Sequence, residues 1–217
     1  MNTHKIAAYM GLAWLLAGCN PLMTASLDTF KAAVGGPAPL ALTQAQVDAV
    51  PFAQIKVTTV SSEGVMALIR QRGDLQFWVA SGKQVLLVRN GLVVRTVGLG
   101  VDLNGTHWQG QSPFQQGLHR LPDGYRSTRQ IDGVDGYRMG IPLTSRMTRK
   151  GIETVEILGK PYALLRVDED VEASGFQARN RYWVDPVDGF IVQSEQHLTP
   201  DLTLTITQLQ PTRKDAR

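Results

Sequence analysis

Apolar residues follow two different periods along the chain, one before residue 51 and another after it. In the first part they recur at the spacing of one helix face, at Met23, Leu27, Phe30 and Val34. The Gly-Gly-Pro sequence at 35–37 ends this pattern, which predicts a short amphipathic helix. Thr43 is a favourable N-cap residue, and Pro51 disfavours helix at the residue before it. A second, shorter helix is therefore predicted between them.

After residue 51, short segments rich in Val, Leu, Ile, Phe and Trp are typical of β-strands. These segments are 55–60, 65–71, 75–80, 85–89, 92–97, 137–143, 152–158, 162–167, 180–184, 190–197 and 202–209. Residues 202–207 alternate strictly between aliphatic residues and threonine, which indicates a strand with one buried face. Asn90 and Gly91 are a strong signal for a two-residue hairpin turn. No helix-length segment separates these strands, so the sequence predicts an antiparallel meander and excludes parallel βαβ folds.

About eleven strands and two short N-terminal helices predict an all-β or β-dominated α+β fold. One-sided alternation favours a large curved antiparallel sheet, either a half-barrel or a sandwich-like meander, whose apolar concave face needs a cover. The helix at 23–34 is a candidate for that cover, or it spaces the body from a membrane. Residues 98–127, rich in Gly, Gln and Asn, are expected to form an irregular excursion rather than a domain boundary.

The first nineteen residues have the three parts of an export signal. A polar start precedes the apolar segment 6–16, which is too short for a membrane-spanning helix of ~20 residues. Leu16, Ala17, Gly18 and Cys19 then resemble the bacterial lipobox, in which the cysteine thiol receives diacylglycerol. An ordinary secretory signal that ends near a cysteine is the alternative. Lipidation is favoured because Cys19, the single cysteine of the chain, stands at the expected place.

Lipidation of Cys19 predicts a covalent diacylglycerol and an N-linked acyl chain such as palmitate, which together anchor a protein stably, and no other cofactor is expected. Asn20, rather than Asp, follows the cysteine. By resemblance to Gram-negative lipoproteins, this predicts the periplasmic face of the outer membrane. The expected division is a signal peptide at 1–18, a lipidated N-terminus with helix and linker at 19–42, a β-rich periplasmic domain at 43–210 and a polar tail at 211–217.

Composition and motifs exclude several classes of function. The 22 Lys and Arg against 19 Asp and Glu give a net charge of +3 without a basic run, which argues against a nucleic-acid partner. A single cysteine excludes an intramolecular disulfide and a cysteine-based zinc cluster. The sequence also lacks a nucleotide-binding glycine loop, an HExxH motif and a GxSxG motif.

Several segments together resemble the YjbF/GfcB family of exopolysaccharide and group 4 capsule lipoproteins. They are the lipobox at Cys19, AVPFAQIKV at 49–57, GLGVDL at 98–103 and, most specifically, NRYWVDPVDGFIVQSEQHLTP at 180–200. The resemblance covers essentially the whole mature chain. It implies an accessory of surface-polysaccharide production, encoded among genes for polysaccharide export, that is not itself a glycosyltransferase. It supplies no catalytic residues.

Aromatic side chains are candidates for polysaccharide binding, because their faces suit the C–H faces of sugar rings. Trp108 and Tyr125 are the preferred candidates, since they lie in the excursion at 98–127. Further aromatic candidates, and amides that could donate or accept hydrogen bonds, are Trp78, Tyr182, Trp183, Gln109, Gln111, Gln115 and Gln116. Packing in the core and in turns is the alternative for all of the aromatic residues.

Formation of turns explains the polar clusters more simply than metal binding or acid-base catalysis does. Asp102, Asn104 and His107 are expected to form a polar turn, because Asp and Asn side chains satisfy nearby backbone amides. Asp132 and Asp135 are also turn residues, and their spacing lacks the other ligands of an EF-hand, so no metal is expected.

Two charged groups of residues are expected to be solvated. The acidic residues Asp168, Glu169, Asp170 and Glu172 are assigned to a loop, since a glycosidase needs two carboxylates that face each other across a cleft. A solvated strand edge is expected to hold the basic residues Arg138, Arg146, Arg149 and Lys150, with contact to anionic polysaccharide or lipid head groups as the alternative.

These observations predict a non-catalytic outer-membrane lipoprotein that assists capsule or exopolysaccharide assembly or export. Its expected partners are the outer membrane, the polymer and polysaccharide-export proteins. Two alternatives stay open: a half-barrel module that handles a lipid or a lipoprotein, and a periplasmic enzyme that trims polysaccharide.

Overall fold

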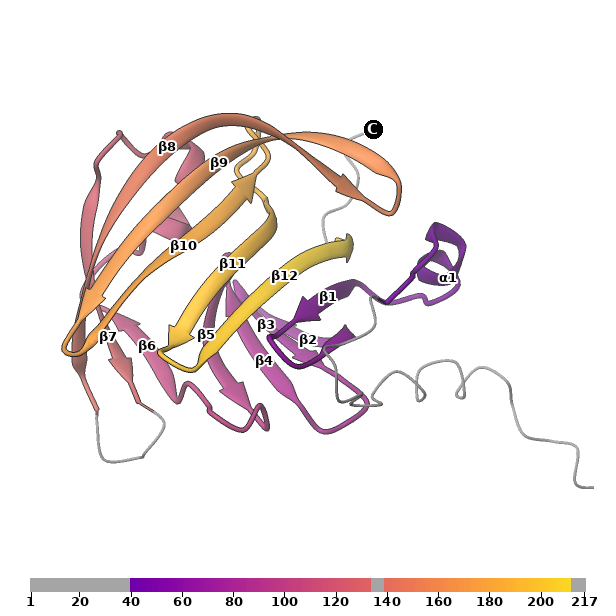
Figure 1. The fold of residues 1–217 in the computed structure, drawn as a ribbon, viewed down its shortest axis with the longest axis horizontal. Coiled ribbons are helices and arrows are strands. Elements are labelled where there is room, and N and C mark those ends of the chain that lie inside the picture. The colour runs from indigo at the N-terminus through magenta and orange to yellow at the C-terminus, as the bar shows by residue number, and fades with distance from the viewer. Residues whose placement is uncertain (1–39, 134–138, 212–217) are drawn as a thin grey trace, which may run out of the picture.

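Twelve strands form one antiparallel sheet that curves until its two end strands nearly meet (Figure 1). The computed structural model describes residues 40–133 and 139–211. In chain order its elements are α1 (Gln44–Asp48), β1 (Gln54–Thr58), β2 (Glu63–Arg72), β3 (Leu75–Val79), β4 (Val85–Arg89), β5 (Leu92–Val97), β6 (Gly105–Trp108), α2 (Pro113–Gln116), the 3₁₀ turn η1 (Leu118–Arg120), β7 (Arg126–Asp132), β8 (Ile141–Ile157), β9 (Lys160–Ala173), β10 (Phe176–Val184), β11 (Ile191–Thr199) and β12 (Leu202–Gln210). The helix expected at 23–34 and the lipidation site Cys19 lie outside the described residues.

The strand order explains how the sheet curves into a barrel. The order is β5-β4-β3-β2-β1-β12-β11-β10-β9-β8-β7-β6, so the chain runs up and down around the barrel and its last strand pairs with its first. The seam lies between β5 and β6, where a backbone hydrogen bond from Thr96 N to Leu103 O (2.9 Å) links the two ends. The predicted antiparallel meander and curved sheet are confirmed, and the structure extends them to near closure.

A glutamine from another part of the barrel satisfies backbone groups at the start of β5. Gln196 of β11 is fully buried, and its Oε1 accepts a hydrogen bond from Val93 N (3.0 Å). Its Nε2 donates to Gly91 O (2.9 Å). Since an unsatisfied buried backbone group costs about 1–3 kcal/mol, Gln196 stabilises the strand next to the open seam.

Apolar side chains fill the barrel in two clusters. The first is centred on the fully buried Trp78, Leu86 and Leu204 of β3, β4 and β12. The second joins Tyr182 of β10 to Phe114 and neighbouring residues of the segment that contains α2 and η1. Part of the excursion at 98–127 therefore occupies the interior at one end of the barrel, where it covers the core.

A third cluster attaches α1 to the long β8–β9 hairpin. Val47 of α1 packs with Ile157, Leu164 and Leu209, and Figure 1 shows the hairpin arching over β12 towards α1. The predicted N-cap is confirmed, because Thr43 and Gln46 form a reciprocal capping box. No helix among residues 40–133 and 139–211 is long and apolar enough to cross a membrane.

The Asn90-Gly91 hairpin is also confirmed, with φ values of 49° and 83° at its two turn residues. Two predictions about which residues form strands are wrong. The excursion at 98–127 contains β6, α2, η1 and the start of β7. Residues 141–143 and 152–157 of two separately expected strands belong to the single strand β8. The polar stretch between them still has one buried face, formed by Ser145 and Met147. Pairing with β9, and with β7 as far as Arg146, keeps it extended.

Candidate functional site: a cleft at the mouth of the barrel

A cleft of about 460 Å³ lies at the end of the barrel that α2 and η1 cover. Its walls come from the turns β2–β3, β4–β5 and β10–β11 and from the α2–η1 segment, which the up-and-down chain brings to the same end. This volume is within the usual range for small-ligand sites, about 300–1,000 Å³. The amide side chains that line the cleft are Gln71, Gln76, Asn90, Gln115, Gln116 and Gln208.

The chemistry of the lining favours a neutral ligand with many hydroxyl groups. Each amide side chain offers a hydrogen-bond acceptor and two donors. The ionised side chains of the lining are Asp74, Asp188 and Arg120, so the charges nearly balance. Phe114 and Phe190 add apolar surface beside the amides.

Both carboxylates of the cleft have structural partners. Asp74 forms an ion pair with Arg89 (3.4 Å) and accepts a hydrogen bond from Asn90 Nδ2 (3.2 Å). Asp188 Oδ1 accepts from Phe190 N (2.8 Å) and thereby shapes the β10–β11 turn. These contacts hold turns in place, which is the role expected of Asp at such positions.

The cleft ends at the core of the barrel. Gly91, Ile191 and Gln208 form part of its lining and also border a void of about 10 Å³ beneath it. A second void, of about 20 Å³, lies between Arg129 and Gln196. Because a space of about 10–15 Å³ holds roughly one water molecule, neither void is of the size that an acyl chain needs.

The α2–η1 segment is positioned by contacts at both of its ends. Ser112 Oγ caps α2 by accepting from Phe114 N (3.2 Å), and the aromatic ring of Phe114 is buried. His119 lies against Gly189, where a Cβ atom would be 2.0 Å from His119 Nδ1. Gly189 also has a φ of 78°, so this close approach requires glycine. The guanidinium of Arg149 donates to the backbone oxygen of His119.

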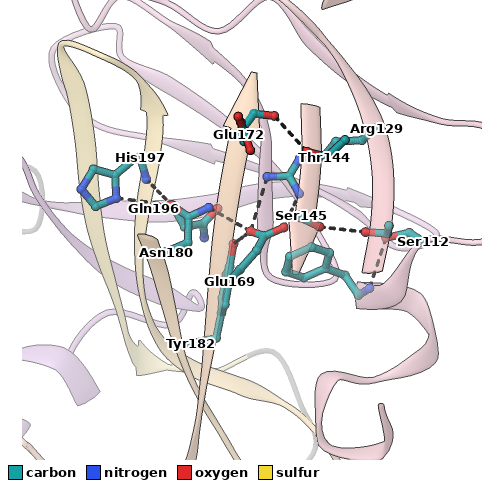
Figure 2. A network of polar contacts seen from close by, with 12 residues as sticks. Ser112, Arg129, Thr144, Ser145, Glu169, Glu172, Asn180, Tyr182, Gln196 and His197 are labelled. Carbon is teal, nitrogen blue, oxygen red and sulfur yellow. Dashed lines mark hydrogen bonds and ion pairs between the residues drawn. The ribbon is translucent and has the colours of Figure 1, made fainter. Parts of the chain in front are cut away.

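A buried polar network lies in the barrel behind this segment (Figure 2). Glu169 of β9 is fully buried and forms an ion pair with Arg129 of β7, whose side chain is 6% exposed. Glu169 Oε2 also accepts hydrogen bonds from Asn180 Nδ2 (2.9 Å) and the Tyr182 hydroxyl (3.1 Å). Asn180 Oδ1 in turn accepts from the backbone N of His197 (2.7 Å). The buried carboxylate therefore has a donor for each of its oxygens.

The charges of this network set its ionisation. Burial, together with the negative charge of Glu169, raises the pKa of Tyr182 well above its usual value, so the phenol stays neutral and donates. For Arg129, burial alone would lower the pKa, but the charge and hydrogen bonds of Glu169 outweigh it and the pKa is raised. Arg129 is thus fixed in its charged state near neutral pH.

A chain of aromatic contacts connects the network to the cleft. The guanidinium carbon of Arg129 lies 5.6 Å from the centroid of the Trp108 ring. Trp108 meets Phe114 edge to face with centroids 6.1 Å apart, and Phe114 meets Tyr182 in the same way at 5.2 Å. Phe114, a cleft residue, is therefore held between side chains that contact the buried charges.

Trp108 and Tyr125, the preferred binding residues, pack beside the core near Phe114 and do not line the cleft. The Tyr125 hydroxyl accepts a hydrogen bond from the cleft residue Gln116 (Nε2, 3.4 Å). Of the candidate amides, Gln115 and Gln116 line the cleft, whereas Gln109 and Gln111 are exposed outside it. Trp78 and Tyr182 are fully buried, and Trp183 packs against the cluster around α1, so core packing accounts for them.

The assignment of the acidic residues to a solvated loop is wrong. They belong to β9, and alternation sends Glu169 into the barrel while Asp168 and Asp170 lie on the other face of the strand, where Asp168 is buried and Asp170 is half exposed. Both are bound by arginines, Asp168 by Arg166 (2.7 Å) and Asp170 by Arg179 (2.6 Å). Glu172, on the same face, accepts from Gln177 Nε2 (3.3 Å). Neighbouring carboxylates on opposite faces do not form the facing pair of a glycosidase.

The strand edge expected for the basic residues is found for only part of the group. Arg146 lies on β8 between β7 and β9, whereas pairing with β7 ends at Arg146 and the exposed Arg149 has only β9 as a strand partner. Lys150 follows them on the same strand, and Arg138 lies outside the described residues, as does Asp135.

The polar turn is confirmed at Asp102 and Asn104, which lie in the irregular segment before β6, whereas His107 belongs to β6. The carboxylate of Asp102 accepts from Gly98 N (2.9 Å) and Leu99 N (3.1 Å). His107 Nε2 lies 3.0 Å from the carboxylate of Asp132. Within the part of the chain that the structure describes, no three His, Cys, Asp or Glu side chains gather as metal ligands.

Known proteins resemble this chain in sequence and in fold. A family model described as "Group 4 capsule polysaccharide lipoprotein gfcB, YjbF" matches residues 27–209. The uncharacterized lipoprotein GfcB of Escherichia coli K12 is 27% identical over 190 residues, which are 86% of this chain and 88% of GfcB. The crystal structure of the hypothetical lipoprotein YmcC from Escherichia coli K12 superposes with a TM-score of 0.71 at 25% identity, over 80% of this chain and 91% of YmcC. The resemblance seen in the sequence is thereby confirmed, and the chain belongs to the YjbF/GfcB family of group 4 capsule polysaccharide lipoproteins.

Proposed function

We propose that this protein is a lipid-anchored accessory of capsule or exopolysaccharide assembly that binds a neutral stretch of the polymer in the cleft. Its family, described as capsule polysaccharide lipoproteins, supports the pathway. One observation supports a neutral sugar as the ligand. Six amide side chains from separate segments of the chain converge on one cleft of about 460 Å³. Binding, and not a reaction, is the proposed role.

The lining matches the surface of a sugar. Hydroxyl groups both donate and accept hydrogen bonds, as amide groups do, so several of them can be satisfied without introducing a charge. Gln115 and Gln116 stand on the α2–η1 segment, and the hydroxyl of Tyr125 holds Gln116 from behind. Trp108 supports Phe114 in the same wall. In this proposal Trp108 and Tyr125 contribute to polysaccharide binding by positioning the residues that make contact.

The proposed location is the periplasmic face of the outer membrane. There, diacylglycerol and an acyl chain on Cys19 anchor the mature protein, after cleavage behind Leu16, Ala17 and Gly18. The family description, which names lipoproteins, supports the anchor. At this place the cleft can meet polymer on its way to the surface, and polysaccharide-export proteins are the proposed protein partners.

The structure supports the two alternative functions less well. A lipid-handling module needs an apolar space for an acyl chain. The voids beside the core are only about 10 and 20 Å³, and a separate groove of about 260 Å³ is lined by polar residues such as Ser61 and Asp201 as well as by apolar ones. A trimming enzyme needs a carboxylate pair poised across the cleft, whereas Asp74 and Asp188 hold turns.

Binding of oligosaccharides released from the strain's own surface polymer, measured by calorimetry, tests the site. The Gln115→Ala/Gln116→Ala variant removes two cleft amides, and affinity should fall by about five- to 150-fold, because lost hydrogen bonds contribute about 0.5–1.5 kcal/mol each. The matched control is Gln109→Ala/Gln111→Ala, which removes two exposed amides outside the cleft from the same excursion. Equal losses in both variants, or no binding by the wild type, would contradict the proposal.

Polymer export tests the role in cells. A deletion strain is complemented with wild type or with Cys19→Ala, and surface and periplasmic polysaccharide are quantified separately. Restoration of surface polymer by the wild type alone is the expected result. Unchanged polymer in both fractions after deletion would remove the pathway from the proposal.

A further inference from the structure

A row of charged residues crosses four strands on the outer face of the barrel. Arg126 of β7 is directly opposite Arg146 of β8, and Arg146 is opposite Asp170 of β9. Asp170 is in turn opposite Arg179 of β10. These four residues belong to the lining of a shallow groove of about 510 Å³ on the wall formed by β7 to β10 (Figure 1).

Among the described residues, two arginines of this row form no ion pair. The carboxylate of Asp170 forms an ion pair with Arg179 (2.6 Å). In the described parts of the chain, no carboxylate forms an ion pair with Arg126 or Arg146, and both side chains are exposed. Like charges directly opposite each other in a sheet are destabilising, so the fold alone does not account for this arrangement.

We propose that Arg126 and Arg146 form a subsite for the carboxylate of an acidic sugar unit. Directly opposite residues have Cβ atoms only about 4.5–5.5 Å apart, so two guanidinium groups there can converge on one carboxylate. Arginine binds carboxylates through two parallel hydrogen bonds, which gives both strength and orientation. Thr144 and Gln177, which also line the groove, offer hydrogen bonds to the neighbouring hydroxyls. This inference rests on the proposed function, because the subsite would bind acidic sugar units of the same polymer whose neutral stretch binds in the cleft.

The composition of the groove favours a sugar carboxylate over an anionic membrane. Surfaces that bind acidic lipids typically gather about four to eight Lys and Arg. Here the groove holds three arginines together with Asp170 and Glu172, which would repel a sheet of phosphates. A single carboxylate can reach the two unpaired arginines without meeting both acids.

The test measures binding of tetragalacturonate, and of its methyl-esterified neutral form, to the mature lipidated protein in detergent. Arg126→Gln/Arg146→Gln should lower the affinity for tetragalacturonate at least about tenfold, because charge-assisted hydrogen bonds are the strong ones. The matched control is Asp170→Asn/Arg179→Gln, which removes a paired couple from the same groove without changing net charge and should leave the affinity unchanged. Binding of the wild type should also weaken with added salt. A cooperative thermal transition at a melting temperature no lower than that of the wild type establishes that each variant is folded.

Three outcomes would overturn the inference. One is that the wild type binds the charged and esterified probes equally, and another is that both double variants lose affinity to the same extent. The third is that Arg126→Gln/Arg146→Gln loses binding to phosphatidylglycerol vesicles but still binds tetragalacturonate. That result would indicate that the groove binds a membrane surface. The cleft is assayed separately with neutral oligosaccharide from the strain's polymer. Neutral binding without acidic binding overturns the subsite alone, whereas loss of both overturns the proposed function as well.

Discussion

Replacing Glu169 by Leu should be among the most destabilising single changes in the barrel. Its carboxylate is fully buried and accepts hydrogen bonds from Arg129, Asn180 and Tyr182. Leucine provides no acceptor, so the variant leaves a buried guanidinium without a counter-charge and two buried donors without partners. Removing one member of a buried ion pair typically costs about 3–5 kcal/mol.

The neighbouring ion pair gives an internal control. Asp170 and Arg179 lie on the same two strands as Glu169 and Asn180 but face outward, with side chains 47% and 53% exposed. Solvent screens such a pair, so Asp170→Asn should cost less than about 1 kcal/mol. The two substituted residues are neighbours in the sequence. We expect their costs in folding stability to differ because Glu169 faces the interior of the barrel and Asp170 faces solvent.

Urea unfolding of four proteins, the wild type, Glu169→Leu, Arg129→Met and the double variant, measures the coupling directly. The double variant should lose less stability than the two single variants added together, with a coupling energy of about 2–3 kcal/mol. For a chain of this size, a loss of 3–5 kcal/mol corresponds to a melting temperature lowered by roughly 6–20 °C. Additive losses within about 0.5 kcal/mol, or a cost for Glu169→Leu no larger than for Asp170→Asn, would refute the reasoning.

Three further predictions concern the same barrel. Because burial and the charge of Glu169 raise the pKa of Tyr182, its contribution to stability is complete below pH ~10 and is lost as the pH rises above that. Tyr182→Phe should flatten this alkaline slope in urea titrations, and an unchanged slope would contradict the assignment. Gln196→Leu orphans two backbone groups at the start of β5, so it should cost about 2–4 kcal/mol and speed amide exchange there, measured by hydrogen exchange. Gly189→Ala places a Cβ against His119 and should weaken both stability and binding in the cleft; adding His119→Ala should recover part of the loss, and no recovery would place the strain elsewhere.

Local patterns were sufficient to predict much of the fold. The alternation at 202–207, the Asn90-Gly91 turn and the Thr43 cap each depend on a few adjacent residues, and all three are confirmed. The central part of β8 was missed because its outward positions are charged and its inward positions include Ser145, so hydrophobicity alone did not mark it. Pairing with β9, and with β7 as far as Arg146, keeps that segment extended, and such pairing is not visible in local sequence.

The cleft could be predicted only in part, for a different reason. Gln115 and Gln116 were identified because they lie in one Gln-rich stretch. Gln71, Asn90 and Gln208 come from three other parts of the chain, and only the closure of the barrel brings them to the same mouth. Arg129 gave no signal in the sequence, because its partner Glu169 is 40 residues away and seemed to be one member of an acidic run.

The filled interior and the position of the cleft have a common physical cause. A nearly closed sheet of twelve strands encloses more space than its own inward side chains occupy near this mouth, and the α2–η1 segment fills the remainder with Phe114 and Leu118. A segment that enters the barrel must also leave its polar side chains outside, and there Gln115 and Gln116 meet the surrounding turns. Phe114 contacts Tyr182, whose hydroxyl is held by Glu169, so the depth of the segment depends on the buried network. The buried charges therefore fix where the cleft amides stand, and a change at Glu169 that leaves the barrel folded should still weaken ligand binding at the mouth.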